Sequence, residues 1–213
     1  MELIATFIDI ILHLDKHLVR MVAEYGVWIY AILFAIIFSE TGFVVTPFLP
    51  GDSLLFVAGA VAATGGMNVH LLVALLIVAA VLGNSVNYAI GRWLGKSFFR
   101  DRGAKWLNPA HLEKAHAFYE EHGGKAIVIS RFLPIVRTYV PFVAGMGAMD
   151  AGRYTLFNVA GGVLWIASLA YAGYFFGNIP WIRGNLTLII VGIIVVSLLP
   201  LVIAFVRARL RPA

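Results

Sequence analysis

Residues 126–149 read AIVISRFLPIVRTYVPFVAGMGAM, an apolar stretch that two prolines and two arginines interrupt. Proline lacks a backbone N–H and disrupts a helix interior, so Pro134 and Pro141 predict a broken segment rather than one continuous helix. Arg131 and Arg137 lie on either side of Pro134. We therefore expect two short helices here, with charged side chains close to the break.

Composition indicates that this broken segment lies in lipid. Of 213 residues, 61% are hydrophobic and 13% are charged, whereas soluble proteins average about 45–50% and 25%. The mean hydropathy is +0.90. A soluble domain of this size cannot bury that much apolar surface. We therefore predict an all-α integral membrane protein. The net charge of +5 comes from a basic loop and tail, which favours contact with a membrane surface over nucleic acid. The chain has no cysteine, which excludes disulfides and thiolate chemistry.

A second broken segment lies in the first half of the chain. Two apolar runs, 27–38 and 53–63, are each shorter than the roughly 20 residues that a crossing needs. Between them residues 40–52 read ETGFVVTPFLPGD. A short helix, a break and another short helix predict a re-entrant hairpin, which persists only where protein or a wet cavity satisfies its backbone. The residues expected to break the two hairpins are Pro47, Pro50, Gly51, Pro134, Pro141 and Gly145.

The remaining segments predict an interfacial helix, a basic loop and three crossings. Residues 92–125 carry seven Lys/Arg and four Asp/Glu. The positive-inside rule therefore places this loop and the arginine-rich C-terminal tail in the cytoplasm. The uncharged link 64–70 is then external, and we favour an internal N-terminus. The other expected elements are an amphipathic helix over 3–19, crossings over 71–91, 154–177 and 186–206, and a helix over 109–122 within the loop.

The two broken segments resemble each other. Phe48-Leu49-Pro50 precedes Phe56-Val57-Ala58-Gly59, and Phe132-Leu133-Pro134 precedes Phe142-Val143-Ala144-Gly145. Weak repeats with corresponding Gly/Pro-broken segments are typical of transporters, whose binding site lies between the repeats at the bilayer midplane. We predict one membrane domain over 1–213, built as an inverted repeat with two opposed re-entrant hairpins. Repeat one covers about 22–95, repeat two about 111–177, and 186–206 is an extra crossing. Gly91-x-x-x-Gly95 and Gly173-x-x-x-Gly177, together with Glu24-Tyr25-Gly26 and Glu121-His122-Gly123, extend the match.

Charges inside the broken segments are the candidate functional groups. Glu40 and Asp52 flank the first break, and Arg131 and Arg137 flank the second. Each charge costs roughly 2.5–3.5 kcal/mol at a membrane helix centre, so the four must be paired, wetted or bound to a ligand. A purely stabilising ion-pair cluster is the structural alternative.

An enzyme is not expected. The chain has neither His-Glu-x-x-His nor Gly-x-Ser-x-Gly, and its six histidines lie outside the predicted crossings. We predict no catalytic residue, no cofactor and no metal site.

Several motifs resemble the DedA family, also called the SNARE-associated or VTT-domain family. They are Ser39-Glu40-Thr41-Gly42, Pro47-Phe48-Leu49-Pro50-Gly51-Asp52, Ser130-Arg131-Phe132-Leu133-Pro134-Ile135-Val136-Arg137, Asn158 and Gly161-Gly162-Val163-Leu164-Trp165. The resemblance covers nearly the whole chain. It departs mildly at Asp52, where many members have glutamate.

The resemblance implies a multi-pass protein of the bacterial inner membrane that supports envelope homeostasis and depends on the proton motive force. It further implies flipping of undecaprenyl phosphate, with Arg131 and Arg137 as headgroup-binding residues and Glu40 and Asp52 as proton-coupling residues. Arginine suits this role because its planar fork matches phosphate. Desolvation and nearby arginines shift a carboxyl pKa in opposite directions, so the sequence leaves the net shift open. A proton-coupled ion, small-molecule or drug transporter and a non-transporting membrane organiser are the alternatives. The expected partners are the lipid and protons, not nucleic acid, and a homo-oligomer is compatible with the sequence.

Overall fold

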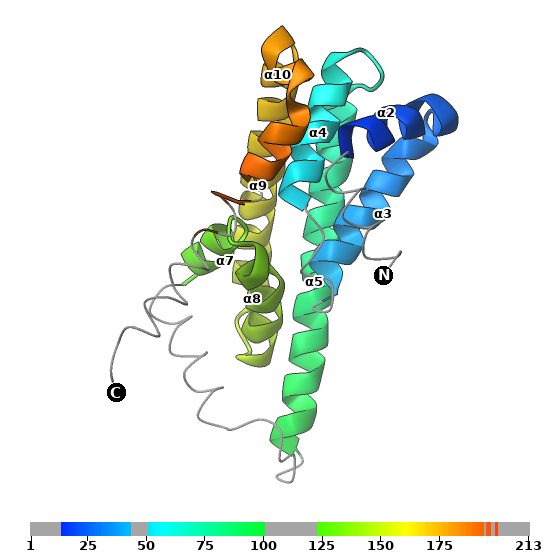
Figure 1. Ribbon diagram of the computed structural model, residues 1–213. Helices are drawn as coiled ribbons and strands as arrows, with labels where there is room; N and C mark the ends of the chain where they lie inside the picture. The colour runs from blue at the N-terminus through cyan, green and yellow to red at the C-terminus, as the bar shows by residue number, and fades with distance from the viewer. Residues whose placement is uncertain (1–13, 44–50, 101–122, 194, 197–198, 200–213) are drawn as a thin grey trace, which may run out of the picture. The chain divides into compact units, whose positions relative to one another are not determined.

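The computed structural model describes residues 14–43, 51–100, 123–193, 195–196 and 199 (Figure 1). Every regular element in these ranges is a helix, which confirms the predicted all-α class. The helices are α2 (Leu14–Tyr25), α3 (Trp28–Gly42), α4 (Gly51–Ala63), α5 (Val69–Arg100), α7 (Lys125–Ser130), α8 (Pro134–Met146), α9 (Ala151–Gly177) and α10 (Pro180–Gly184), and residues 186–193 are also helical.

Two helices are long and apolar enough to cross a membrane. The qualifying spans are Val69–Gly95 within α5 and Ala151–Gly177, which is the whole of α9. They match the crossings predicted over 71–91 and 154–177. The helices α3 and α4 are apolar but shorter, as expected for the two arms of a broken segment. Together with the composition, these spans make the chain a membrane protein.

Both predicted breaks are present. In the second, α7 ends at Ser130, and α8 begins at Pro134 after Leu133 in an extended conformation (φ −118°, ψ 101°). The residue before a proline avoids the helical region, and proline fits the first helical position, so the Leu133-Pro134 pair sets the start of α8. In the first, α3 ends at Gly42 and α4 begins at Gly51.

Three local predictions are wrong. Residues 92–100 are the last turns of α5 rather than the start of a loop, because basic residues mark where a helix leaves lipid and not where its hydrogen bonding stops. Pro141 and Gly145 lie inside α8 instead of breaking it. A proline removes one intrahelical hydrogen bond and kinks a helix, and the remaining bonds of α8 continue past it.

Some predicted features lie outside the described residues. They are the first part of the amphipathic helix at 1–13, the breaking residues Pro47 and Pro50, the loop helix over 109–122, and the end of the last crossing at 200–206.

The chain divides into two compact units. Unit 1 comprises Met1–Phe34, Phe48–Leu76 and Ile166–Ala213, and unit 2 comprises Ala35–Pro47 and Ile77–Trp165. The helices α3, α5 and α9 therefore contribute residues to both units.

In unit 1, α4 packs directly on the backbone of α9. A Cβ added to Gly173 would collide with the backbone of Phe56, and one added to Gly177 would collide with Ala60. In the other direction, a Cβ on Gly59 would collide with the carbonyl of Ala170. Only glycine permits this close approach between two helices.

Unit 2 contains the corresponding contacts between α8 and α5. A Cβ on Gly91 would collide with the backbone of Phe142, and one on Gly95 would lie 3.0 Å from the backbone of Met146. A Cβ on Gly145 would collide with the carbonyl of Tyr88. These are the glycines that the sequence repeat aligns. In both units the short helix of one repeat therefore packs on the long helix of the other.

The remaining match in the repeat, between Gly26 and Gly123, corresponds to a shared backbone conformation. Gly26, which follows α2, has a φ of +53°, and Gly123, which precedes α7, has a φ of +58°. Both glycines adopt the left-handed conformation that side chains disfavour. The two aligned glycines therefore share a backbone conformation.

Candidate functional site

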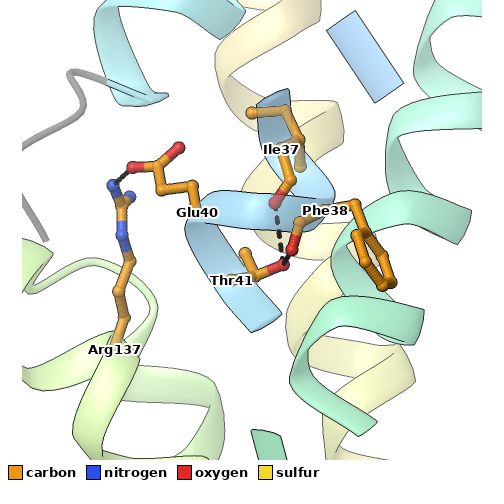
Figure 2. Close-up of polar contacts among 5 residues, drawn as sticks. All are labelled: Ile37, Phe38, Glu40, Thr41 and Arg137. Carbon is orange, nitrogen blue, oxygen red and sulfur yellow. Dashed lines mark hydrogen bonds and ion pairs between the residues drawn. The ribbon is translucent and has the colours of Figure 1, made fainter. Parts of the chain in front are cut away.

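Glu40 lies in the last turn of α3 and is fully buried. The next residue, Thr41, donates its hydroxyl proton to the carbonyl oxygen of Ile37 at 2.8 Å and lies 3.3 Å from that of Phe38 (Figure 2). The Thr41 side chain is thus turned back along its own helix. The Glu40 carboxylate points away from α3 (Figure 2).

The partner of Glu40 is Arg137 of α8. The Nη2 group of Arg137 donates to Oε1 of Glu40, and the two side chains are 4% and 0% exposed (Figure 2). The pair joins the end of α3, the first arm of the first broken segment, to α8 of the second. Removing either member of a buried ion pair leaves an uncompensated charge, so each residue holds the other in place.

Arg131 lies beside this pair in the same unit but has a different environment. It is 1% exposed, and its Nη2 donates to the backbone carbonyl of Asn158 at 3.1 Å and to the side-chain oxygen of the same residue. With the Asn84 amide oriented so that its oxygen faces Arg131, that oxygen accepts from Nη2 at 2.9 Å. All of these acceptors are neutral. Within the described ranges, Nε and Nη1 of Arg131 are buried without a hydrogen-bond partner.

A tryptophan connects the two arginines. The guanidinium carbon of Arg137 lies 4.9 Å from the centroid of the Trp165 ring, and that of Arg131 lies 6.0 Å from it. Both distances are within the range of a cation–π interaction. Trp165 is fully buried.

Three asparagines surround the charges and donate to backbone carbonyls of the helices around them. Asn87 Nδ2 donates to the carbonyl oxygens of Thr41 at 3.3 Å and Thr138 at 2.8 Å. Asn158 Nδ2 donates to the carbonyl of Val81 at 3.0 Å. Asn84 donates to Thr41 when its oxygen faces Arg131. Of these carbonyls, that of Thr41 lies in the last turn of α3, where carbonyls lack intrahelical partners, so the amides that reach it stabilise the edge of the first break.

The structure brings together three of the four charged residues predicted from the sequence. Glu40, Arg131 and Arg137 form one buried cluster with two positive charges and one negative charge. Asp52 belongs to unit 1, where it lies half-buried in the first turn of α4. The role of Asp52 remains a prediction. Among the described residues, no group of three His, Asp or Glu is placed to hold a metal ion.

Sequence reasoning missed the part that α9 plays. Asn158, Gly161, Gly162 and Trp165 follow the spacing i, i+3, i+4, i+7, which places them on one face of a helix. A Cβ on Gly161 would lie 3.0 Å from Cδ of Arg131, and one on Gly162 would lie 3.6 Å from its Nη2. This face therefore combines a hydrogen-bond acceptor, space for a long side chain and an aromatic ring. The helical spacing was the available signal.

Comparison with known proteins places the chain in a family. Residues 49–175 match the VTT domain. The Escherichia coli K12 protein called Protein DedA is 57% identical over 211 residues, which cover 98% of this chain and 96% of that protein. The chain belongs to the DedA family. No solved structure matches it.

More distant relatives retain the resemblance over much of their length. An uncharacterized membrane protein of Mycobacterium leprae is 43% identical over 169 residues, covering 79% of this chain and 76% of that protein. The Escherichia coli K12 inner membrane protein YqjA is 41% identical over 155 residues, covering 71% of this chain and 69% of that protein. The DedA family match begins within the first broken segment and runs nearly to the end of α9. It therefore includes Arg131, Arg137 and Trp165.

Proposed function

We propose that this protein moves a phosphate-bearing lipid, polyprenyl phosphate in the first instance, across the bacterial inner membrane with coupled proton movement. The observation that carries the proposal is the environment of Arg131. It is a buried guanidinium with neutral acceptors, and two of its N–H groups lack a partner among the described residues. Among the described residues this cluster has two positive charges and one negative charge, and an uncompensated charge at membrane depth is strongly unfavourable. An anionic ligand would relieve that cost.

Phosphate fits this site for geometric reasons. Guanidinium groups present a planar set of donors that bind phosphate oxygens in a bidentate manner. Arg131 and Arg137 lie over one tryptophan ring, so two such donor sets are held close together. A polyprenyl chain attached to the phosphate would remain in the surrounding lipid.

Glu40 supplies a route to proton coupling. It neutralises Arg137 in the structure. Protonation of its carboxyl would release Arg137 for phosphate, and loss of that proton would favour return of the ion pair and release of the headgroup. Asp52 is the second candidate for the proton-carrying group.

The repeated helix contacts support an alternating mechanism. Glycine-to-backbone contacts join α4 to α9 in unit 1 and α8 to α5 in unit 2. Opposed re-entrant hairpins built on an inverted repeat would give the same site access to either side of the membrane. We expect the basic loop that follows α5 and the C-terminal tail to lie on the cytoplasmic side, as the positive-inside rule predicts.

Reconstituted liposomes test the proposal. The purified protein should expose polyprenyl phosphate headgroups on the opposite leaflet faster than headgroups of ordinary phospholipids. Arg131→Lys and Arg137→Lys should each lower the rate at least about tenfold, because lysine keeps the charge but not the bidentate geometry. Arg153→Lys, at an exposed position, is the matched control and should keep the wild-type rate. Full activity in both buried lysine variants would contradict phosphate binding by arginine.

The proton step has its own test in the same liposomes. Glu40→Gln and Asp52→Asn mimic the protonated carboxyl. One of the two variants should lose the response of transport to an imposed pH gradient while still binding the headgroup. If both variants respond as the wild type does, proton coupling through these acids is wrong, and lipid binding by the arginines is unaffected. Transport of a soluble cation with no lipid movement would favour a solute transporter instead.

A further inference from the structure

Trp165 is the largest fully buried side chain in the described part of the protein. It sits on α9 one helical turn beyond Gly161 and Gly162, which make room for Arg131. Its ring lies under both guanidinium groups, at 4.9 Å from Arg137 and 6.0 Å from Arg131. These two contacts indicate a role for Trp165 beyond packing.

The ring and Asn158 act on Arg131 in different ways. Asn158 accepts two hydrogen bonds from Nη2, one through its backbone and one through its side chain. That fixes one corner of the guanidinium. The tryptophan face attracts the cation without occupying its N–H groups. Nε and Nη1 of Arg131 therefore remain available while the group is held in position.

The Trp165 ring also contacts Arg137, which would exchange its carboxylate partner for phosphate in the proposed mechanism. In the structure Arg137 donates to Glu40. When the carboxylate gives up that bond, the contact with Trp165 remains, because it does not involve the N–H groups. The ring would thus keep Arg137 beside Arg131 during the change from carboxylate to phosphate.

We infer that Trp165 is a positioning residue of the phosphate site, whose ring face holds the Arg131 and Arg137 guanidinium groups together so that both can bind one phosphate. This inference rests on the proposed function. It concerns how the binding groups are arranged and not which lipid is moved. An aromatic residue used in this way contributes preorganisation, which strengthens binding without direct contact with the ligand.

Fluorinated tryptophan separates this role from packing. Trp28, Trp93, Trp106 and Trp181 are replaced by phenylalanine, so that tryptophan remains at 165 alone. The protein is then produced with tryptophan carrying zero to four ring fluorines. Fluorine withdraws charge from the ring face with little change of shape. The affinity for farnesyl phosphate in nanodiscs should fall stepwise with each fluorine, by about tenfold over the series. The midpoint of thermal unfolding should change much less.

Each outcome bears on a different claim. Stepwise loss of farnesyl phosphate affinity supports the inference. Unchanged affinity across the fluorine series, with farnesyl phosphate bound more tightly than farnesol, overturns the role of Trp165 and leaves the proposed function standing. Equal binding of farnesyl phosphate and farnesol by the wild-type protein overturns the proposed function itself.

Single substitutions in the natural chain provide a second measurement where the tryptophan-depleted chain does not fold. Trp165→Phe keeps a weaker ring face and should bind farnesyl phosphate with intermediate affinity. Trp165→Leu removes the face and should bind about tenfold more weakly than wild type. Trp28→Leu, at a 70% exposed position, controls for loss of an indole and should bind normally. Equal affinity of the leucine and phenylalanine variants at position 165 would contradict the inference.

Discussion

Units 1 and 2 use the same packing device but bury different chemistry. In each unit a short helix meets the backbone of a long helix through glycines. Ten polar or charged residues are buried among the described positions, and nine of them belong to unit 2, with Ser53 as the exception. Both units also contain an apolar cluster, formed in unit 1 by Phe56, Ala60 and Leu186 and in unit 2 by Tyr88, Ile127, Ala144, Met149 and Tyr154. The repeated sequence therefore supplies a scaffold twice, whereas the candidate binding groups are concentrated in one half.

The largest expected effect comes from breaking the charge arrangement of unit 2. Glu40→Ala leaves Arg137 as a second buried cation without its carboxylate, and should lower the free energy of unfolding by about 3–5 kcal/mol. Asp52→Ala, the matched change in the first turn of α4 in unit 1, should cost less than Glu40→Ala, because Asp52 is half-buried and its charge is partly solvated. Denaturant unfolding of both variants in detergent micelles measures the difference. Equal losses would mean that the two acids contribute equally to the free energy of unfolding.

The next effect tests whether the two scaffolds are equivalent. Gly91→Ala in unit 2 and Gly173→Ala in unit 1 each place a methyl group against opposing backbone. Both should lower stability by similar amounts, about 1–3 kcal/mol, because helix backbones cannot move apart without losing neighbouring contacts. Gly192→Ala, where no atom lies within 4 Å of the added Cβ, is the control. It should be neutral or stabilising by up to about 1 kcal/mol. A large loss at one glycine and none at the other would break the correspondence.

The smallest effect compares one hydrogen bond in each unit. Tyr154 donates to the carbonyl of Asn84 at 2.8 Å in the buried part of unit 2. Tyr171 hydrogen-bonds to Nδ1 of His70 at 2.8 Å at an exposed position of unit 1. Tyr154→Phe removes a buried hydrogen bond, while the Asn84 carbonyl keeps its bond within α5, and should cost about 0.5–1.5 kcal/mol. Tyr171→Phe should cost less than about 0.5 kcal/mol, because water can replace the lost partner. The same unfolding measurement decides whether burial produces this difference.

The sequence predicted those features that depend on local chain chemistry. Leu133-Pro134 could be identified as a helix start because proline restricts its neighbour as well as itself. The glycines at 91 and 173 could be matched because the repeat keeps their order. The lack of Lys and Arg between Met21 and Gly91 indicated a long membrane-embedded stretch in the first half of the chain.

Features that depend on tertiary contacts could not be predicted in the same way. The pairing of Glu40 with Arg137 rather than with Arg131 is decided by which helix faces α3, and four charges alone allow several pairings. The sequence identifies Trp165 only as part of a family motif, because a tryptophan in an apolar helix does not indicate which side chains lie over its ring. The end of α5 was predicted too early, because charged residues mark where the chain reaches water and do not mark where the helix ends.

The length of α5 limits how this protein can rearrange. Its 32 residues rise about 48 Å, which exceeds the roughly 30 Å of bilayer hydrocarbon. Trp93 is 71% exposed and follows Arg92, which bonds to the Tyr88 hydroxyl at 2.8 Å. A piston movement of one turn, about 5.4 Å, toward the Val69 end would draw Arg92 into hydrocarbon and push Leu71 into water, and the opposite movement would draw the exposed His70 into hydrocarbon. The depth of α5 is thus fixed from both ends, and bending or reseating the short helices beside the breaks is the less costly motion.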